Sequence, residues 1–559
     1  MTNNHNIRDA EGRRISRRKF LVATGLAGIA AVGGYGPARA EASGTGFRLV
    51  SAADRQRGFT VAALQAHSAM ADHLNQAGHL VRDLFGVSDF VCQSSGEKHS
   101  VLEQLWIGGH GSVRVWAEIH QAGRGDQPVH VRLRVANGFR FNIRTISFDL
   151  PEFTARAPAD TRVLDSCCGG REYAWRAGHS DDGEDYYRYS ALVVFYDARS
   201  GAGVSVDFFD DRLRQSGCSW HIDGNVCRPR VHSYLNLSKG RETTLDFYVR
   251  SYARGMPDIA LDDYRELRLA PTMKRYGMVE STALKTESPW ACTGWPFPDL
   301  VKQVAQAKLL GARGYIQWAP PDGKGFYEPF PERLAWLRQL KAASRVGIAL
   351  GVLIDPRFSP RVDQSAAAWK LDQRFLPARV VPMASQTTSA QSYLLKMRDN
   401  LAANGVSMAF WDTGGMAYPS FTPEGYLTLL EQWRRRGIRI MPEVSRDYSA
   451  WITGVALNWG LPHGNDDRPH FTFQQPPRCQ VLKRVTPQAK MFRGGVLRPL
   501  LGQGSRYWWD AFAGDPATVV VLTTGAYAAK PAELETWAKE HARAAGGGEW
   551  ELKRDLGRR

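Results

Sequence analysis

The sequence predicts a multidomain β plus α/β protein, with an N-terminal antiparallel β-sandwich followed by a (β/α)8, TIM-like barrel. Apolar residues alternate with period two from about residue 100 to 255, and strand patterns alternate with helix patterns after residue 275. At 559 residues the chain is also too long for one ordinary domain. Its 43% hydrophobic and 23% charged residues are typical of soluble globular proteins.

The first 40 residues are expected to be a twin-arginine signal peptide outside the fold. A basic start is followed by "SRRKFL" at 16–21, a glycine-softened apolar stretch and "ARA" at 38–40. An N-terminal membrane anchor is the alternative, but five glycines make the stretch weakly apolar. We therefore expect export by the twin-arginine machinery to the periplasm or the medium. No later run of 18 apolar residues exists, so no stable membrane span is expected in the mature protein.

Residues 41–260 are predicted to form the β-sandwich domain. A helical pattern leads it within residues 53–85, and β-rich runs separated by Gly, Asp and Asn turns follow. These runs include "SVRVWAEIHQ", "VHVRLRVANG", "FNIRTISFDL", "ALVVFYDARSG", "GVSVDFFDD" and "TTLDFYVRSYA". The domain boundary is expected near residues 254–271.

Residues 275–545 are predicted to form the barrel, and residues 546–559 a C-terminal tail. Predicted strands start at residues 314, 347, 406 and 438, and the 33- and 32-residue spacings each match one βα unit. The repeat is hard to follow between residues 455 and 515. An open doubly wound sheet is the alternative, but neither G-x-G-x-x-G nor a Walker motif is present.

Three consecutive predicted strands end in a carboxylate, namely Asp355, Asp412 and Glu443. Carboxyl ends of barrel strands meet at one rim, where barrel enzymes place their chemistry. A lone carboxylate there can equally cap a helix. Paired carboxylates are the groups that hydrolyse glycosidic bonds, and tips of neighbouring strands can place them ~5–5.5 Å apart, as retaining enzymes require.

Asp412 is the candidate nucleophile because it ends the buried run of "MAFWDTGG" and is followed by two glycines. Glu443 is the candidate acid/base, since an ionised Asp412 beside it would raise its pKa. Arg357 or Arg446 could hold Asp412 ionised, or either could form a structural ion pair.

Tryptophans and polar residues at the same rim suggest sugar binding. Thirteen of the seventeen tryptophans follow residue 275, and flat aromatic faces suit the C–H faces of sugar rings. The candidate substrate-binding residues are Trp318, Asp355, Arg357, Trp411, Arg446, Trp459 and His463.

The layout of residues 100–545, with Asp412 in "AFWDTGG" at the end of strand four, resembles the α-galactosidase and α-glucosidase superfamily of glycoside hydrolases. That resemblance implies a sandwich followed by a barrel, and an aspartate nucleophile at position 412. It also implies an aspartate acid from beyond strand five, which favours Asp466 or Asp467 over Glu443. The α-amylase-like enzymes instead pair a strand-four aspartate with a strand-five glutamate, but they carry arginine where this chain has Phe410.

The leading interpretation is an exported glycoside hydrolase or transglycosylase acting on a poly- or oligosaccharide. The alternative is a non-catalytic protein that binds carbohydrate or assists envelope-polysaccharide assembly. A metal-dependent hydrolase using His463, Asp466 and His470 is a third interpretation, although no cofactor and no metal are expected because the loop lacks a ligand pair on one helix face.

The basic charge does not indicate a nucleic-acid partner. Loss of residues 1–40 removes seven basic and two acidic residues and lowers the net charge from +16 to +11. The remaining basic residues are scattered, with no Lys/Arg-rich tract.

Seven cysteines are present. After export, Cys218 and Cys227 could close a hairpin loop as a disulfide, or they could be small buried thiols.

Overall fold

The structure is a computed structural model in which Glu41–Arg559 forms one compact unit. The predicted signal peptide and C-terminal tail lie outside the residues that it describes. The described residues are 47–49, 61–67, 79–80, 86–87, 91–95, 99–108, 111–121, 128–138, 142–150, 152–167, 170–175, 180–181, 188–214, 216–286, 290–293, 299–309, 312–317, 334–354, 358–359, 381–382, 388–411, 423–442, 445–458, 480–497 and 515–524.

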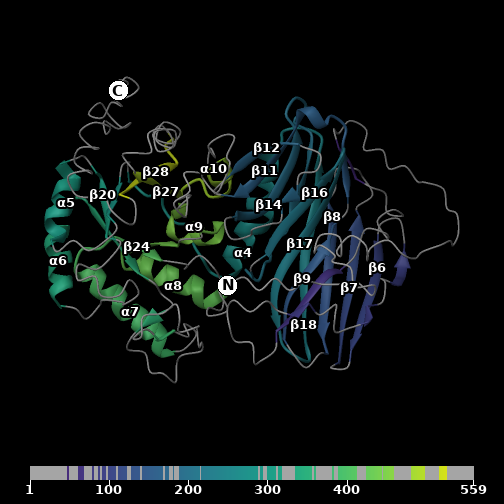
Figure 1. Cartoon of the computed structure of the whole chain (residues 1–559), viewed down its shortest axis with the longest axis horizontal. Coiled ribbons are helices and arrows are strands. Elements are labelled where there is room, and N and C mark those ends of the chain that lie inside the picture. Colours follow the sequence, from purple (N-terminus) through teal and green to yellow (C-terminus); the bar gives the residue numbers. More distant parts are fainter. Residues whose placement is uncertain are drawn as a thin grey trace, which may run out of the picture. The chain divides into compact units, whose positions relative to one another are not determined.

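The N-terminal half contains a ten-stranded antiparallel sheet (Figure 1). Its strands are β4 Gly86–Val87, β5 Val91–Ser95, β6 His99–Gly108, β7 Gly111–Gln121, β8 Val129–Asn137, β11 Thr161–Cys167, β12 Arg171–Ala174, β14 Arg188–Asp197, β15 Gly203–Asp207 and β18 Arg241–Tyr252. The spatial order is β12-β11-β14-β15-β18-β8-β7-β6-β4, with β5 paired to β6. The period-two runs predicted from the sequence therefore form strands.

A second, eight-stranded sheet pairs its strands antiparallel as well. Its strands are β1 Phe47–Leu49, β2 Val61–His67, β3 His79–Leu80, β9 Asn142–Asp149, β10 Phe153–Ala155, β13 Ser180–Asp181, β16 Ser216–Asp223 and β17 Val226–Leu237. The helix predicted within residues 53–85 is wrong for residues 61–67, which form β2. Its ladder with β9 outweighs the helical propensity of the Ala- and Leu-containing segment.

One apolar core joins the two sheets. In β8, Val129, Val131, Leu133 and Val135 are buried, while the residues between them are only partly covered or exposed. They share a cluster with residues of β9, β16 and β17 from the other sheet, such as Phe148. This is the packing of a β-sandwich, in which each sheet turns one face inward.

A helical connector, residues 258–275, leads from the sandwich to the second half. It consists of α3 Asp258–Tyr264, the π-helical turn η4 Arg265–Leu269 and α4 Ala270–Arg275. Its buried residues belong to a cluster that continues from the outer face of β14 into the helices of the second half. The connector predicted as a boundary from the sequence is thus part of a continuous core.

The second half contains an eight-stranded sheet whose ladders are all parallel. Its strands are β19 Trp290–Thr293, β20 Gly314–Gln317, β21 Ala349–Ile354, β24 Met408–Trp411, β25 Arg439–Pro442, β26 Val455–Asn458, β27 Lys490–Leu497 and β28 Thr518–Thr524. In the spatial order β25-β24-β21-β20-β19-β28-β27-β26, the strands extend from β19 through β20, β21 and β24 to β25 on one side, and through β28 and β27 to β26 on the other. Strands β26 and β27 lie in the stretch where the sequence repeat was hard to follow. A separate short hairpin is formed by β22 Phe358–Ser359 and β23 Val381–Pro382.

Six helices are described between or after these strands, and α5 to α8 flank the parallel strands in Figure 1. They are α5 Leu300–Leu309, α6 Leu334–Ser344, α7 Thr388–Ala403, α8 Pro423–Arg435, α9 Asp447–Thr453 and α10 Gln480–Val485. Pro423 stands at the first position of α8, where its missing N–H costs nothing. After α8, Gly437 takes a φ of 88°, a left-handed conformation suited to a helix end.

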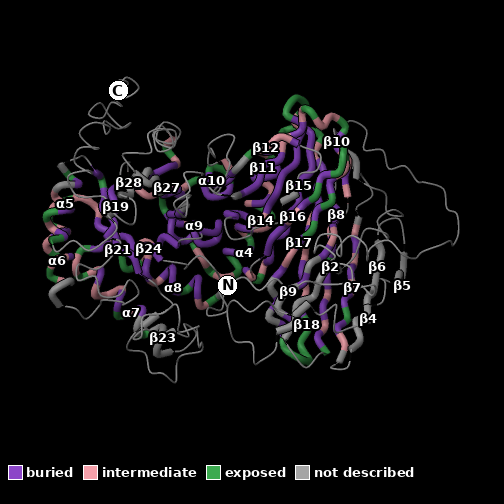
Figure 2. Tube along the Cα trace, in the orientation of Figure 1, coloured by how far each residue is buried: buried purple, intermediate pink, exposed green. Residues whose placement is uncertain are grey.

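The parallel sheet is buried on both faces. Figure 2 shows β21 and β24 as buried segments. One face packs on the helices, through residues such as Tyr315, Val352, Ala409 and Ile440. The other face, called the inner face below, is lined by a separate cluster to which all eight strands contribute. This cluster consists of Trp290, Cys292, Ile316, Leu353, Met408, Phe410, Met441, Val455, Leu457, Phe492, Val519 and Val521.

The buried members of the inner-face cluster include no helix residue among the part of the chain that the structure describes. Strand side chains therefore cover one another, as in a sheet curled on itself. At Gly314 a Cβ would lie 2.3 Å from the Trp290 ring, so only glycine leaves room for this indole.

Of the two alternatives for Cys218 and Cys227, the structure shows buried free thiols and not a disulfide. The β16–β17 hairpin forms, but its register pairs Cys218 with Val231 and Cys227 with Ile222. The two cysteines are thus four residues apart along the hairpin, roughly 13 Å, whereas a disulfide needs Cα atoms within about 7 Å.

Among the described helices, none is long and apolar enough to cross a membrane.

Candidate active site

Side chains in the parallel strands alternate strictly between the two faces. In β24, Met408 and Phe410 belong to the inner-face cluster, and Ala409 and Trp411 to the helix-side cluster. In β25, Met441 lies on the inner face and Ile440 on the helix side. This alternation therefore predicts which face of the sheet the residue directly after each strand points toward.

Nine of the predicted site residues lie outside the described residues. These are Trp318, Asp355, Arg357, Asp412, Glu443, Trp459, His463, Asp466 and Asp467. The structure describes the strands that lead to most of them, and it describes Trp411 and Arg446 directly.

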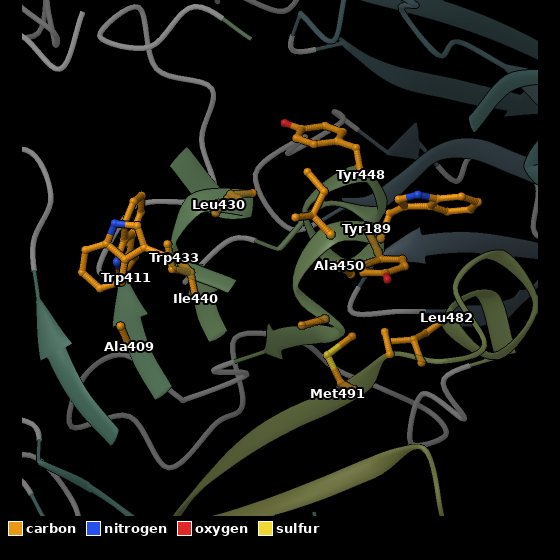
Figure 3. Packing of buried hydrophobic residues seen from close by; sticks show 14 of the residues in the cluster. Tyr189, Ala409, Trp411, Leu430, Trp433, Ile440, Tyr448, Ala450, Leu482 and Met491 are labelled. Atoms are coloured by element: carbon orange, nitrogen blue, oxygen red, sulfur yellow. The ribbon is translucent and has the colours of Figure 1, made fainter. Parts of the chain in front are cut away.

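Trp411 lies in the core and not on the inner face. Its indole is fully buried and meets the Trp433 ring of α8 edge to face, with centroids 5.4 Å apart (Figure 3). Ile440 and Leu430 belong to the same helix-side cluster. This packing leaves no indole face for a sugar ring, so the predicted substrate contact of Trp411 is replaced by a structural role.

Arg446 has a structural role in the part of the chain that the structure describes. Its side chain is buried, and its Nη1 donates a 2.6 Å hydrogen bond to the carbonyl oxygen of Arg188 in β14. Arg446 precedes α9, and its backbone N–H donates to Ser449 Oγ at 3.0 Å. The guanidinium thus joins the end of β25 to the sandwich.

The end of β25 is fixed on both sides of the two-residue segment 443–444. Pro442 is the last residue of the strand, and the buried Ser445 follows the segment. Ser445 Oγ donates to the Pro442 carbonyl at 2.8 Å and accepts the Leu457 N–H of β26 at 2.7 Å. The segment that carries the candidate acid at position 443 thus lies between two residues with defined positions, Pro442 and Ser445.

Asp447, which the sequence did not single out, is a buried carboxylate beside this segment. Its Oδ2 accepts a 2.7 Å hydrogen bond from the Tyr264 hydroxyl, and its Oδ1 accepts the Tyr448 N–H at 2.7 Å. Burial raises the pKa of Asp447 to about 6, although these hydrogen bonds lower it in part. The sequence signal that could have identified Asp447 is its position four residues after Glu443, the predicted catalytic carboxylate.

Metal and cofactor ligands were sought among the described residues. No group of three or more His, Cys, Asp or Glu side chains gathers there in a way that could hold a metal ion. The candidate metal loop with His463, Asp466 and His470 lies outside those residues.

The sandwich, the connector and the parallel sheet with its two buried faces define a two-part β plus α/β architecture. No protein-family model and no curated protein matches the sequence.

Several solved structures superpose on this chain at low sequence identity. Ligand-free alpha-N-acetylgalactosaminidase NagBb from Bifidobacterium bifidum superposes with a TM-score of 0.53 at 13% identity, over 85% of this chain and 87% of that one. Its GalNAc complex gives 0.51 at 12% identity, over 77% and 78%. The alpha-galactosidase TtGalA from Thermus thermophilus, with stachyose, gives 0.41 at 10% identity, over 77% and 97%. At these identities the NagBb likeness shows a shared fold alone, and the TtGalA match adds no argument.

Proposed function

We propose that this protein is an exported glycoside hydrolase, or a transglycosylase of the same mechanism, that cleaves a poly- or oligosaccharide with retention of configuration. The reaction is proposed to take place at the carboxyl ends of the parallel strands, inside a closed (β/α)8 barrel.

The ladder register of three neighbouring strands carries this proposal. The β21–β24 ladder pairs Ile354 with Trp411, and the β24–β25 ladder pairs Trp411 with Pro442. Continued by one residue, these ladders predict a cross-strand row of Asp355, Asp412 and Glu443. Parallel strands are ~4.8 Å apart, so neighbours in such a row fit the ~5–5.5 Å carboxyl separation of retaining glycosidases.

The alternation of faces supports the same arrangement. Positions 412 and 443 continue the inner-face sequence of Phe410 and Met441, and position 355 continues that of Leu353. Positions 318 and 459 continue the inner-face sequence of Ile316 and Leu457 in the same way. Three carboxylates and two tryptophans are thus expected on one face, as a sugar subsite requires.

Closure of the barrel is proposed from the strand order and the inner-face packing. β25 and β26 stand at the two ends of the strand order, yet their Cα atoms approach within 8 Å. Ser445 joins them by its two hydrogen bonds.

In this mechanism Asp412 attacks the anomeric carbon while Glu443 protonates the leaving oxygen. Water then hydrolyses the glycosyl-enzyme with Glu443 as base. Crowded carboxylates favour one protonated member, which matches a proton donor beside an ionised nucleophile. Asp466 and Asp467 are the alternative acids. Trp318 and Trp459 are proposed to stack on the sugar, with Arg357 and His463 binding hydroxyl groups.

The test is a panel of aryl glycosides, beginning with the α-N-acetylgalactosaminide, and of polysaccharides. Turnover by the purified chain should fall at least about a thousandfold in Asp412→Asn, because the amide cannot attack. Asp399→Asn is the matched control, because this α7 carboxylate is 47% exposed, and it should keep full activity. The first product should have the anomeric configuration of the substrate by NMR.

If the protein binds a sugar but turns over no member of the panel, the proposal of an enzyme is wrong and a non-catalytic carbohydrate-binding protein is the interpretation that stands. An inverted product would retain the enzyme and exclude Asp412 as nucleophile.

Export is proposed from the twin-arginine pattern alone. N-terminal sequencing of the protein from a periplasmic fraction should begin at residue 41, and Arg17→Lys with Arg18→Lys should leave the precursor in the cytoplasm. Export of the double variant would contradict the twin-arginine route.

A further inference from the structure

The joint between β25 and β26 differs from the other strand pairs of the parallel sheet. Each of the seven other neighbouring pairs forms a ladder, whereas the described residues of β25 and β26 form none. The side chain of Ser445 connects them instead. The strand that precedes Glu443 therefore has ladder support on one side only, from β24.

The segment after β25 is held by the sandwich and the connector. Arg446 donates to the Arg188 carbonyl of β14, and Asp447 accepts from the Tyr264 hydroxyl of α3. The same hydroxyl accepts the N–H of Ala191, also in β14, at 3.1 Å. Two consecutive residues after the joint are thus connected to β14. Arg446 is hydrogen-bonded to it directly, and Asp447 is connected through Tyr264.

Helix α10, which lies between β26 and β27 in the chain and directly precedes β27, also contacts the sandwich. The Tyr189 hydroxyl of β14 is hydrogen-bonded to Thr486 Oγ1, directly after α10. At Gly170 a Cβ would lie 3.1 Å from the backbone nitrogen of Val481, so the chain beside β12 touches the first turn of α10. The segment after β25 and helix α10 therefore contact the same region of the sandwich.

The strand that receives these contacts is firmly anchored. β14 is paired on both sides, with β11 and β15. The buried Arg188 guanidinium donates to Asp165 Oδ1 at 3.1 Å and to the Cys218 carbonyl of the other sheet. Buried, fully paired charges of this kind favour one geometry over others.

We propose that the sandwich positions the tip of β25, with Arg446, Asp447 and Tyr264 as positioning residues for the acid at position 443. This inference rests on the proposed function for its effect on catalysis. The connection is short: Arg446 and Asp447 follow Glu443 by three and four residues, and Ser445 fixes the chain between them. A displacement of about 1 Å in a catalytic group can lower the rate about a hundredfold.

Tyr264→Phe is the test variant, and Tyr315→Phe is its matched control. Both substitutions remove one hydroxyl from a buried tyrosine, but the Tyr315 hydroxyl donates to Gln303 within β20 and α5, away from the joint. Tyr264→Phe should lower kcat about tenfold and change KM less than about twofold, because only the reacting group moves. Tyr315→Phe should keep kcat while its melting temperature falls by a similar amount. Equal kcat losses in the two variants, or no loss in either, would overturn the proposal.

Hydrogen exchange tests the positioning without any turnover. In Tyr264→Phe, amides of residues 445–458 should exchange at least about tenfold faster than in wild type, while those of 314–317 keep their rates. Tyr315→Phe should show the reverse pattern. If wild type cleaves no glycoside but these patterns appear, the proposed function fails and the positioning stands. Unchanged exchange over 445–458 overturns the positioning, and Asp447→Asn serves as the second variant if Tyr264→Phe does not fold.

Discussion

The sandwich and the parallel sheet bury their strands in different ways. A sandwich strand such as β8 alternates buried with partly covered or exposed residues, and Arg132 and Arg134 stand on its open face. A parallel strand such as β24 is buried at all four positions. Polar groups can therefore occupy every second position of a sandwich strand, whereas the parallel strands accept them mainly where the strand ends.

This difference explains why the candidate chemistry lies at strand ends. Gln317 is the last residue of β20, and Asp355, Asp412 and Glu443 follow directly after their strands. A carboxylate one or two residues earlier would sit inside an apolar core, where ionisation costs several kcal/mol. Four experiments test this difference between the sandwich strands and the parallel strands.

Glu443→Gln should have the largest effect of the four, and the effect should depend on the leaving group. With a sugar leaving group, kcat should fall about a hundred- to ten-thousandfold, because the departing oxygen then needs a proton. With a nitrophenolate leaving group the loss should be far smaller. If Asp466→Asn or Asp467→Asn shows this pattern and Glu443→Gln does not, the acid is that aspartate.

Trp433→Ala should cost about 3–5 kcal/mol of unfolding free energy, because it empties a fully buried site against Trp411. Trp116→Ala in β7 is the matched change on the open face of the sandwich. There the indole lies under the Arg134 guanidinium, 3.8 Å from the ring centroid, and the loss should be about 1 kcal/mol. Denaturant titration measures the unfolding free energy of both variants. Equal losses would contradict the proposed difference in burial between the two kinds of strand.

Asp447→Asn should remove a pH dependence of stability. Burial raises the folded-state pKa of Asp447 from 3.8 to about 6, so its protonated form favours folding. This contribution is complete below about pH 4 and is lost as the pH rises through about 6. The unfolding free energy of the variant, minus that of wild type, should therefore increase by roughly 3 kcal/mol across this range.

The subtraction is needed because His232 acts in the opposite direction. Burial lowers its pKa from 6.5 to about 4, so its contribution to stability grows as the pH rises through this range. A difference between variant and wild type that stays flat from pH 4 to 6 would contradict the assignment to Asp447.

A reducing agent should have the smallest effect. Cys218 and Cys227 are free, so both should be alkylated in protein that is unfolded without dithiothreitol, and reduction of this hairpin should not change the melting temperature. A bridged hairpin would instead protect both thiols and lose several degrees on reduction.

The period of apolar residues and the spacing of the predicted strands identified many of the strands of the fold. The runs at 112–121 and 129–138 form strands because their alternation matches one buried face. Residues 61–67 were assigned to a helix because "VAALQAH" contains good helix formers, and only the ladder to β9, about 80 residues away, makes them a strand.

The sequence predicted the ends of the strands that lead to the candidate site, but not the face toward which each side chain points. Trp411 and Asp412 were both placed at the rim, but neighbouring residues in a strand point to opposite faces, and Trp411 points to Trp433. Arg446 could not be assigned from its neighbours in the chain, because its partner, the Arg188 carbonyl, lies 258 residues away.

The continuous core across the connector has a consequence for dissecting the protein. Leu192, Val194 and Tyr196 of β14 share one cluster with Leu261 of the connector and with Leu482 of α10. A chain cut near residue 257 would leave apolar surface on both fragments, and the carboxylate of Asp447 would have no tyrosine donor. The sequence pattern changes at this point, but the apolar core continues across it, so expression trials should keep both halves on one polypeptide.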